Sequence, residues 1–125
     1  MVYFISGHRD LTQEEFNYYY IPLIKTALND KKSIFLVGDY DGADIMAQKY
    51  LNDNIDNIER VVVYHIGGEP MNIANKNFPR IGGWKDDIER DTAMTNASVQ
   101  DIAWIRKGKE NSGTAQNILR RFTFY

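Results

Sequence analysis

The chain has 125 residues, 43% of them hydrophobic and 26% charged, which is the size and balance of one ordinary globular domain. Its formal net charge is -2, from 15 basic and 17 acidic residues. This balance argues against binding of nucleic acid through a broad basic face. The absence of cysteine excludes disulfides and thiolate metal sites. We expect neither a metal nor a cofactor, because only His8 and His65 could supply imidazole ligands and no ligand spacing links them.

The first residues are apolar over too short a length for a signal peptide or a membrane span, and no basic segment precedes them. We therefore expect a cytoplasmic protein with no membrane partner. No repeat, low-complexity tract or linker divides the sequence. Residues 1–125 are accordingly predicted to form a single domain.

Taken in chain order, the sequence first predicts a buried strand at residues 2–5. Thr12 and Glu15 then have the spacing of a capping box, in which a hydroxyl and a carboxylate three residues later open a helix. Pro22 should kink that helix, because proline removes one of the backbone hydrogen bonds.

A second apolar run at residues 33–37 predicts another strand. Apolar side chains in residues 43–51 recur at helical spacing, and residues 60–66 read as a third strand. Residues 67–84 contain Gly, Pro and Asn at close intervals, which predicts a long loop. Residues 85–96 are predicted to be helical.

The last part of the chain predicts a fourth strand at residues 99–105 and a helix at residues 115–121. Residues 122–125 could add an edge strand. Strands and helices thus alternate, which predicts an α/β, Rossmann-like domain with a parallel sheet of four or five strands and helices on both faces.

Three strand-to-helix turns have the composition of a ligand site: residues 6–10, 38–44 and 108–114. Glycine lets a backbone approach a ligand closely, and helix N-termini offer unpaired amide donors with partial positive charge. Any one of these turns could be purely structural. Because ligands bind beyond the carboxyl ends of parallel strands, three such turns on one edge predict a pocket.

Four motifs resemble the SLOG superfamily of LOG- and DprA-related Rossmann-like proteins, in particular its YspA-like branch. Residues 6–12 (Ser-Gly-His-Arg-Asp-Leu-Thr) resemble its first-strand turn, and residues 38–44 its Gly-Ala-Asp element. Residues 90–94 resemble its arginine-to-methionine segment, and residues 108–114 its closing Gly-Thr turn. The motifs follow the family's order and span nearly the whole chain.

The resemblance implies a sheet ordered 3-2-1-4-5, in which the first and fourth strands lie side by side. It also implies a nucleotide-derived ligand, such as an ADP-ribose-type signal. With the three turns, it predicts these ligand-binding residues: Ser6, Gly7, His8, Arg9, Gly38, Asp39, Gly42, Asp44, Arg90, Met94, Lys109, Ser112, Gly113 and Thr114.

Arg9 and Arg90 are predicted to bind phosphate, because a guanidinium meets phosphate oxygens bidentately. The structural alternative is an ion pair with Asp10 or Asp91. Asp44 is predicted to contact ribose hydroxyls, although an aspartate in the first turn of a helix is favourable for the helix dipole alone.

Two further predictions concern the remaining polar residues of the turns. Ser112 and Thr114 could donate to a phosphate and also cap the last helix, and these two roles are compatible. His8 is expected to be exposed on its loop.

The chain departs from the enzymatic members of the superfamily at Gln116 and Asn117, where those members carry glutamate. Cleavage of an N-glycosidic bond needs a carboxylate as nucleophile or base. We therefore expect a protein that binds its ligand without turnover, as a sensor or a sequestering protein.

Two alternatives remain open, and one further expectation concerns assembly. The first alternative is an N-glycosidase or deoxyribosyltransferase-like enzyme that uses Asp44 and Asp91. The second is a DNA-processing accessory protein, which the net charge disfavours. A homo-oligomer is expected through the aromatic helix at residues 16–28 or through the last helix.

Overall fold

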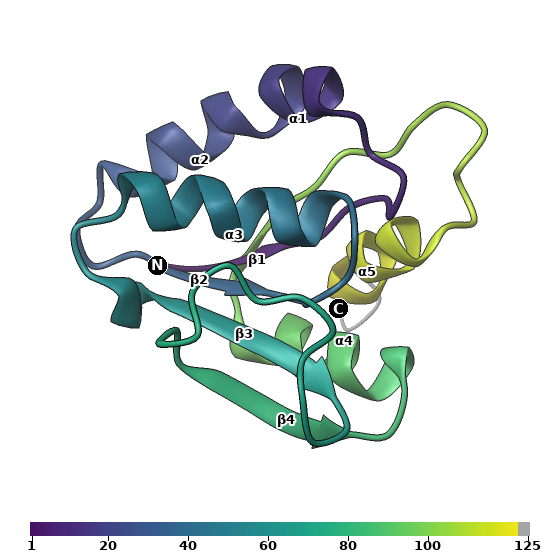
Figure 1. Cartoon of the computed structure of the whole chain (residues 1–125). Helices are drawn as coiled ribbons and strands as arrows, with labels where there is room; N and C mark the ends of the chain where they lie inside the picture. The colour runs from purple at the N-terminus through teal and green to yellow at the C-terminus, as the bar shows by residue number, and fades with distance from the viewer. Residues whose placement is uncertain (123–125) are drawn as a thin grey trace.

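Five parallel strands form one sheet in the computed structural model, which describes residues 1–122 (Figure 1). The three central strands are β1 (Val2–Ile5), β2 (Ile34–Val37) and β3 (Val61–Ile66). They read as almost continuous apolar runs because helices bury both of their faces. The α/β, Rossmann-like fold class predicted from the sequence is confirmed.

The strand order is β4-β3-β2-β1-β5, which differs from the predicted order at one strand. The expected fourth strand is β5 (Gln100–Ile102), which lies beside β1 as expected but is only three residues long. The additional strand is β4 (Arg80–Trp84), beside β3 at the opposite edge and within the predicted loop. The predicted edge strand at residues 122–125 is wrong at Phe122, which ends a helix, and residues 123–125 lie outside the described residues.

β4 carries no apolar pattern that could predict it. Its side chains are exposed or half-buried, and two of its five residues are glycines. A Cβ atom on Gly82 would lie 2.1 Å from Cε1 of the His65 ring, so the absence of a side chain lets β4 lie against β3. Pairing with β3 thus forms this strand despite its low intrinsic propensity.

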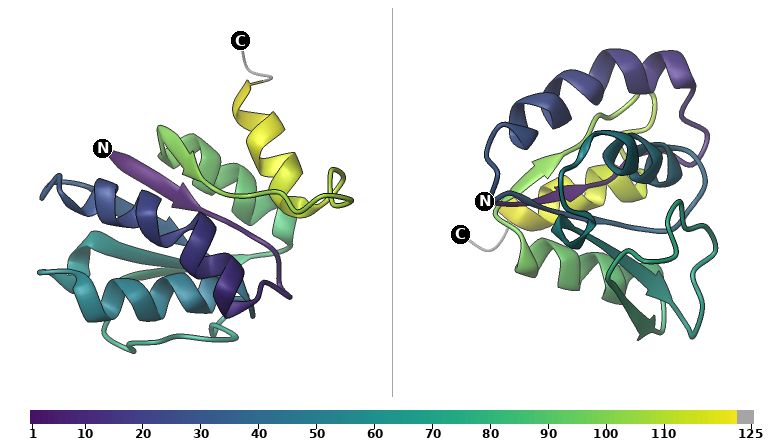
Figure 2. Two further views of the ribbon diagram at one scale, coloured as in Figure 1. Left: turned by 90° about the horizontal axis from the view of Figure 1, so that it is seen from above. Right: turned by 60° about the vertical axis from the view of Figure 1, so that its left-hand side comes forward.

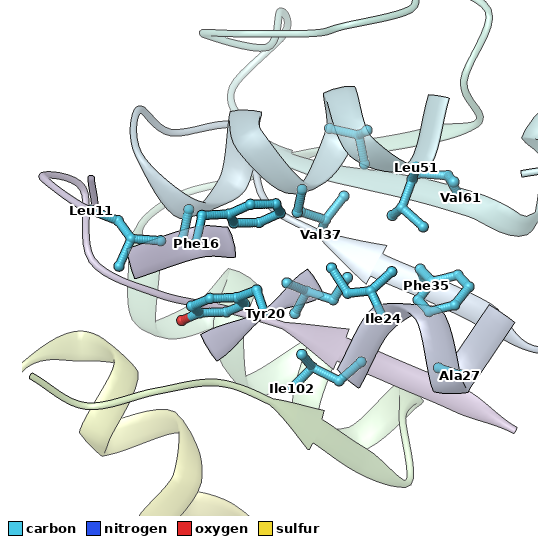
Figure 3. Close-up of a cluster of buried hydrophobic side chains, with 14 of the residues drawn as sticks. Leu11, Phe16, Tyr20, Ile24, Ala27, Phe35, Val37, Leu51, Val61 and Ile102 are labelled. Atoms are coloured by element: carbon cyan, nitrogen blue, oxygen red, sulfur yellow. The ribbon is translucent and has the colours of Figure 1, made fainter. Parts of the chain in front are cut away.

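The helices α1 (Gln13–Tyr19), α2 (Ile21–Leu28) and α3 (Ala43–Asn54) cover one face of the sheet (Figure 1). The predicted capping box opens α1. The predicted kink at Pro22 is a break between two helices, and this proline occupies the first turn of α2, where no N–H is needed. Figure 3 shows the aromatic and aliphatic side chains of α1 and α2 packed over the strands.

The helices α4 (Asp87–Ala97) and α5 (Gly113–Phe122) lie on the other face, as the two views in Figure 2 show. A second, smaller cluster of Phe4, Leu36, Tyr64 and Met94 fills this side. A short 3₁₀ turn, Ile58–Arg60, precedes β3. None of the helices within residues 1–122 has the length and apolar character needed to cross a membrane.

Candidate functional site

A cavity of about 490 Å³ opens at the carboxyl ends of the strands, between the turns after β1 and β2 and the first turns of α4 and α5. This places the turns at residues 6–10, 38–44 and 108–114 on one edge, as expected. Every predicted ligand-binding residue except Asp39 and Gly42 lines this cavity: Ser6, Gly7, His8, Arg9, Gly38, Asp44, Arg90, Met94, Lys109, Ser112, Gly113 and Thr114.

Gly42 and Asp39 were predicted to contact ligand, but neither residue lines the cavity. Gly42 has φ +74°, and a Cβ atom there would lie 2.3 Å from the carbonyl oxygen of His8. It therefore allows the β2 turn to pack against the β1 turn. Asp39 is buried and accepts hydrogen bonds from Arg90 Nη1 at 3.1 Å and from the Met71 amide at 2.6 Å.

Two side chains fix the turn after β1 to the segment after β5. The buried hydroxyl of Tyr20 donates to the Ser6 carbonyl at 2.8 Å and accepts from the Trp104 amide at 3.1 Å. Arg106 binds both oxygens of Glu15, at 2.7 and 3.1 Å, and Asp10 at 2.9 Å. These contacts hold one side of the cavity in place before any ligand arrives.

His8 is buried, which contradicts the prediction that it is exposed on its loop. Its Nε2 accepts a hydrogen bond from the Arg106 amide at 2.9 Å, so this nitrogen carries no proton. Burial, with the nearby Arg106 charge, lowers the pKa of His8 below its usual value of 6.5. The neutral ring joins two turns of the cavity wall.

Arg90 is a buried cation with two carboxylate partners. Its Nη1 donates to Asp39 and its Nε donates to Asp91, both at 3.1 Å. The structural alternative of an ion pair with Asp91 is therefore present, and Asp39 is a second partner that was not expected. Nη2 makes no hydrogen bond to any residue in the described part of the chain, so it remains available to the cavity that Arg90 lines.

Asp44 lies in the first turn of α3 and is buried in the cavity wall. Its Oδ2 accepts from the Tyr40 amide at 3.1 Å. Gly38 makes room for it, because a Cβ atom at Gly38 would lie 2.5 Å from that oxygen. Burial raises the pKa of Asp44 to about 7, and the Arg90 charge opposes this shift only in part.

Tyr40 forms an outer wall of the cavity with Arg9 and Asp87. The Arg9 guanidinium lies 3.8 Å from the centre of the Tyr40 ring, and that of Arg90 lies 4.4 Å from it. Asp87 accepts hydrogen bonds from the Tyr40 hydroxyl and, at 3.2 Å, from Arg9. Arg9 is therefore stacked and paired, yet its side chain stays largely exposed at the cavity mouth.

The first turn of α5 opens into the cavity with unpaired donors. Ser112 caps the helix by accepting from the Ala115 amide at 3.2 Å, which confirms the predicted cap. No described residue accepts a hydrogen bond from the amides of Gly113 and Thr114. Lys109, which forms no ion pair within residues 1–122, lines the same region. This combination of amides, hydroxyls and an ammonium group suits an anion.

Five further residues line the cavity that were not among the predicted ligand contacts: Phe4, Asp10, Tyr40, Asp87 and Asn117. Phe4 could have been found from strand alternation, because it shares a face of β1 with Ser6. Asn117 could have been found from helix spacing, since it follows Thr114 by one turn. Asp10 and Tyr40 lie within two of the predicted turns, whereas no local signal points to Asp87, which meets Tyr40 across 47 positions of sequence.

No metal site accompanies the cavity: within residues 1–122, no group of three or more His, Asp or Glu side chains is placed to hold an ion. Comparison with known proteins finds no matching family model, no similar curated protein and no similar solved structure.

Proposed function

We propose that this protein binds a nucleotide-derived small molecule, bearing phosphate and ribose groups, and holds it without turnover as a sensor or a sequestering protein. The observation that carries the proposal is the first turn of α5, with Lys109, opening into the cavity. A volume of about 490 Å³ lies in the range of small-molecule sites, roughly 300–1,000 Å³. The resemblance of the four motifs to the SLOG superfamily is consistent with this class of ligand.

The distribution of charge supports a ligand with an anionic and a hydroxyl-bearing part. Lys109 and the α5 amides provide donors for phosphate at the mouth. Asp44 and Asp91 provide carboxylate oxygens that can accept hydrogen bonds from a ribose diol. A site that binds the ground state and the transition state of its ligand equally tightly has affinity for the ligand but does not accelerate its cleavage.

An N-glycosidase is the second candidate, and one observation favours it. Asp44 is a buried carboxyl group in the cavity wall with a pKa of about 7, which is the property of a general acid near neutral pH. Against this candidate, the α5 residue that lines the cavity at the position of the enzymatic glutamate is Asn117, an amide that can neither attack nor activate water.

Incubation with nucleoside monophosphates, ADP-ribose and cyclic ADP-ribose-type molecules distinguishes the two candidates. We expect intact ligand to be recovered after denaturation of the protein, with no release of free base. Chromatography with mass spectrometry measures both. Steady base release that Asp44→Asn or Asp91→Asn abolishes would establish the enzyme instead.

We also expect a homodimer or larger assembly through α1 and α2. Tyr18 of α1 is 75% exposed and Leu23 of α2 is 49% exposed, and an interface would remove these apolar side chains from water. Light scattering at micromolar concentration should give at least twice the monomer mass of 14.5 kDa. The double variant Tyr18→Ser, Leu23→Ser should give the monomer mass, whereas a monomeric wild-type protein would contradict the prediction.

A further inference from the structure

In the cavity wall, one buried hydroxyl lacks a hydrogen-bond partner and one buried side-chain amide is only partly paired. Ser6 is 6% exposed, and its Oγ makes no hydrogen bond to any residue in the described part of the chain. Asn117 is 3% exposed and is held by one bond, in which its Oδ1 accepts from Arg120 Nη1 at 2.7 Å. Nothing within residues 1–122 accepts from its Nδ2.

The bond from Arg120 sets the orientation of the Asn117 amide. With Oδ1 engaged by a donor on the same helix, Nδ2 is the end of the amide left for the cavity that Asn117 lines. Asn117 follows Thr114 by one helical turn, so it lies one turn beyond the first turn of α5, whose unpaired amides suit an anion.

Two apolar side chains line the same cavity as these two groups. Phe4 and Met94, both at most 2% exposed, line the cavity and belong to the same smaller core cluster. Ser6 follows Phe4 by two positions and so lies on the same face of the β1 segment. The cavity wall therefore contains two buried apolar side chains together with the unpaired Ser6 Oγ and Asn117 Nδ2, whereas Lys109 and Arg9 are exposed.

Unpaired buried polar atoms cost free energy that a ligand can recover. We infer that Ser6 and Asn117 form a base-reading subsite, in which Asn117 Nδ2 and Ser6 Oγ hydrogen-bond the edge of a planar heterocycle that lies against Phe4 and Met94. The inference rests on the proposed function and extends it, because it assigns the uncharged half of the ligand to a heterocycle with a hydrogen-bond acceptor. Phosphate and ribose alone would leave this subsite empty.

Calorimetry with defined probes tests the subsite: AMP, GMP, CMP, UMP and ADP-ribose are compared with ribose 5-phosphate, which has no base. We expect the best base-bearing probe to bind at least about tenfold more tightly than ribose 5-phosphate. Ser6→Ala and Asn117→Leu should each lower the affinity for that probe by about fivefold to tenfold, the effect of losing one hydrogen bond. Neither variant should change the affinity for ribose 5-phosphate by more than about twofold, because this probe has no base to bond to the subsite.

The matched control is Gln116→Met, which removes an amide from the neighbouring exposed position of α5 and should change no affinity. A second measurement needs no variant: the side-chain amide resonance of Asn117 should shift on addition of the base-bearing probe and stay in place with ribose 5-phosphate.

Three results would overturn the subsite, and they separate it from the proposed function. Equal affinity of the wild type for ribose 5-phosphate and every base-bearing probe would refute the subsite alone. If the variants lost affinity equally for base-bearing probes and for ribose 5-phosphate, and the Asn117 amide resonance did not shift, the two residues would have a structural role only. Binding of no probe at all would refute the proposed function together with the subsite.

Discussion

Arg90→Ala is expected to destabilise the protein by about 3–5 kcal/mol, the cost of removing one partner of a buried ion pair. The side chains of Arg90 and Asp39 are 5% and 4% exposed, so the aspartate would keep a buried charge with no cation beside it. Asp91 would lose the same partner. Denaturant unfolding at pH 7 measures the difference in the free energy of unfolding.

Arg9→Ala is the matched control, because it removes an arginine from the same cavity. Its ion pair with Asp87 is exposed, with side-chain exposures of 62% and 49%, and such pairs contribute about 0–1 kcal/mol. A loss of less than about 1 kcal/mol for Arg90→Ala, equal to that of the control, would show that the buried pairs add no stability.

Ligand binding gives Arg90→Ala a second readout, at a temperature where the variant is folded. If Nη2 of Arg90 binds phosphate, the variant should bind a phosphorylated ligand more weakly by about 1.5–3 kcal/mol, the range of charged hydrogen bonds. It should bind the matching nucleoside almost as well as the wild type. Equal losses for both ligands would assign Arg90 to structure alone.

Asp44→Asn is expected to have a higher free energy of unfolding than the wild type, by an amount that grows as the pH rises from 4 to 8. Asp44 holds its proton up to about pH 7 in the folded chain, whereas its ordinary value is 3.8. Between these values the folded state binds more protons than the unfolded state, so the wild-type free energy of unfolding falls with rising pH. This shift in the pKa of Asp44 lowers the wild-type free energy of unfolding by on the order of 4 kcal/mol once the pH is above 7.

An amide at position 44 never ionises, and its oxygen can still accept from the Tyr40 amide. The variant should therefore match the wild type near pH 4 and exceed it near pH 8, which unfolding curves at both values measure. Asp53→Asn, at an exposed position on the same helix, is the control, with an expected change below about 0.5 kcal/mol. A difference between Asp44→Asn and wild type that does not vary with pH would contradict the prediction.

The same substitution should separate stability from function. Asp44 lines the cavity, and a carboxylate that accepts hydrogen bonds from a ribose diol binds it better than an amide does. A variant that is more stable at pH 8 yet binds ligand less well would identify Asp44 as a residue whose burial serves the site.

The class of fold and most of the cavity wall could be predicted from the order of residues along the chain. Apolar runs at residues 2–5, 33–37 and 60–66 and helical spacing between them sufficed, because local periodicity reflects which face is buried. Polar and glycine residues directly after those runs had to meet at one edge, since parallel strands all end there. That geometric rule brought Ser6, Asp44 and Ser112 to one cavity from distant parts of the chain.

Features that depend on contact between distant segments could not be predicted and became visible only in the folded chain. β4 forms because β3 offers it an edge, although its own residues are exposed and rich in glycine. Arg90 pairs with Asp39, 51 positions away, as well as with its neighbour Asp91. The proton affinity of Asp44 is set by its burial. Partner choice and desolvation are properties of packing, and spacing along the chain carries neither.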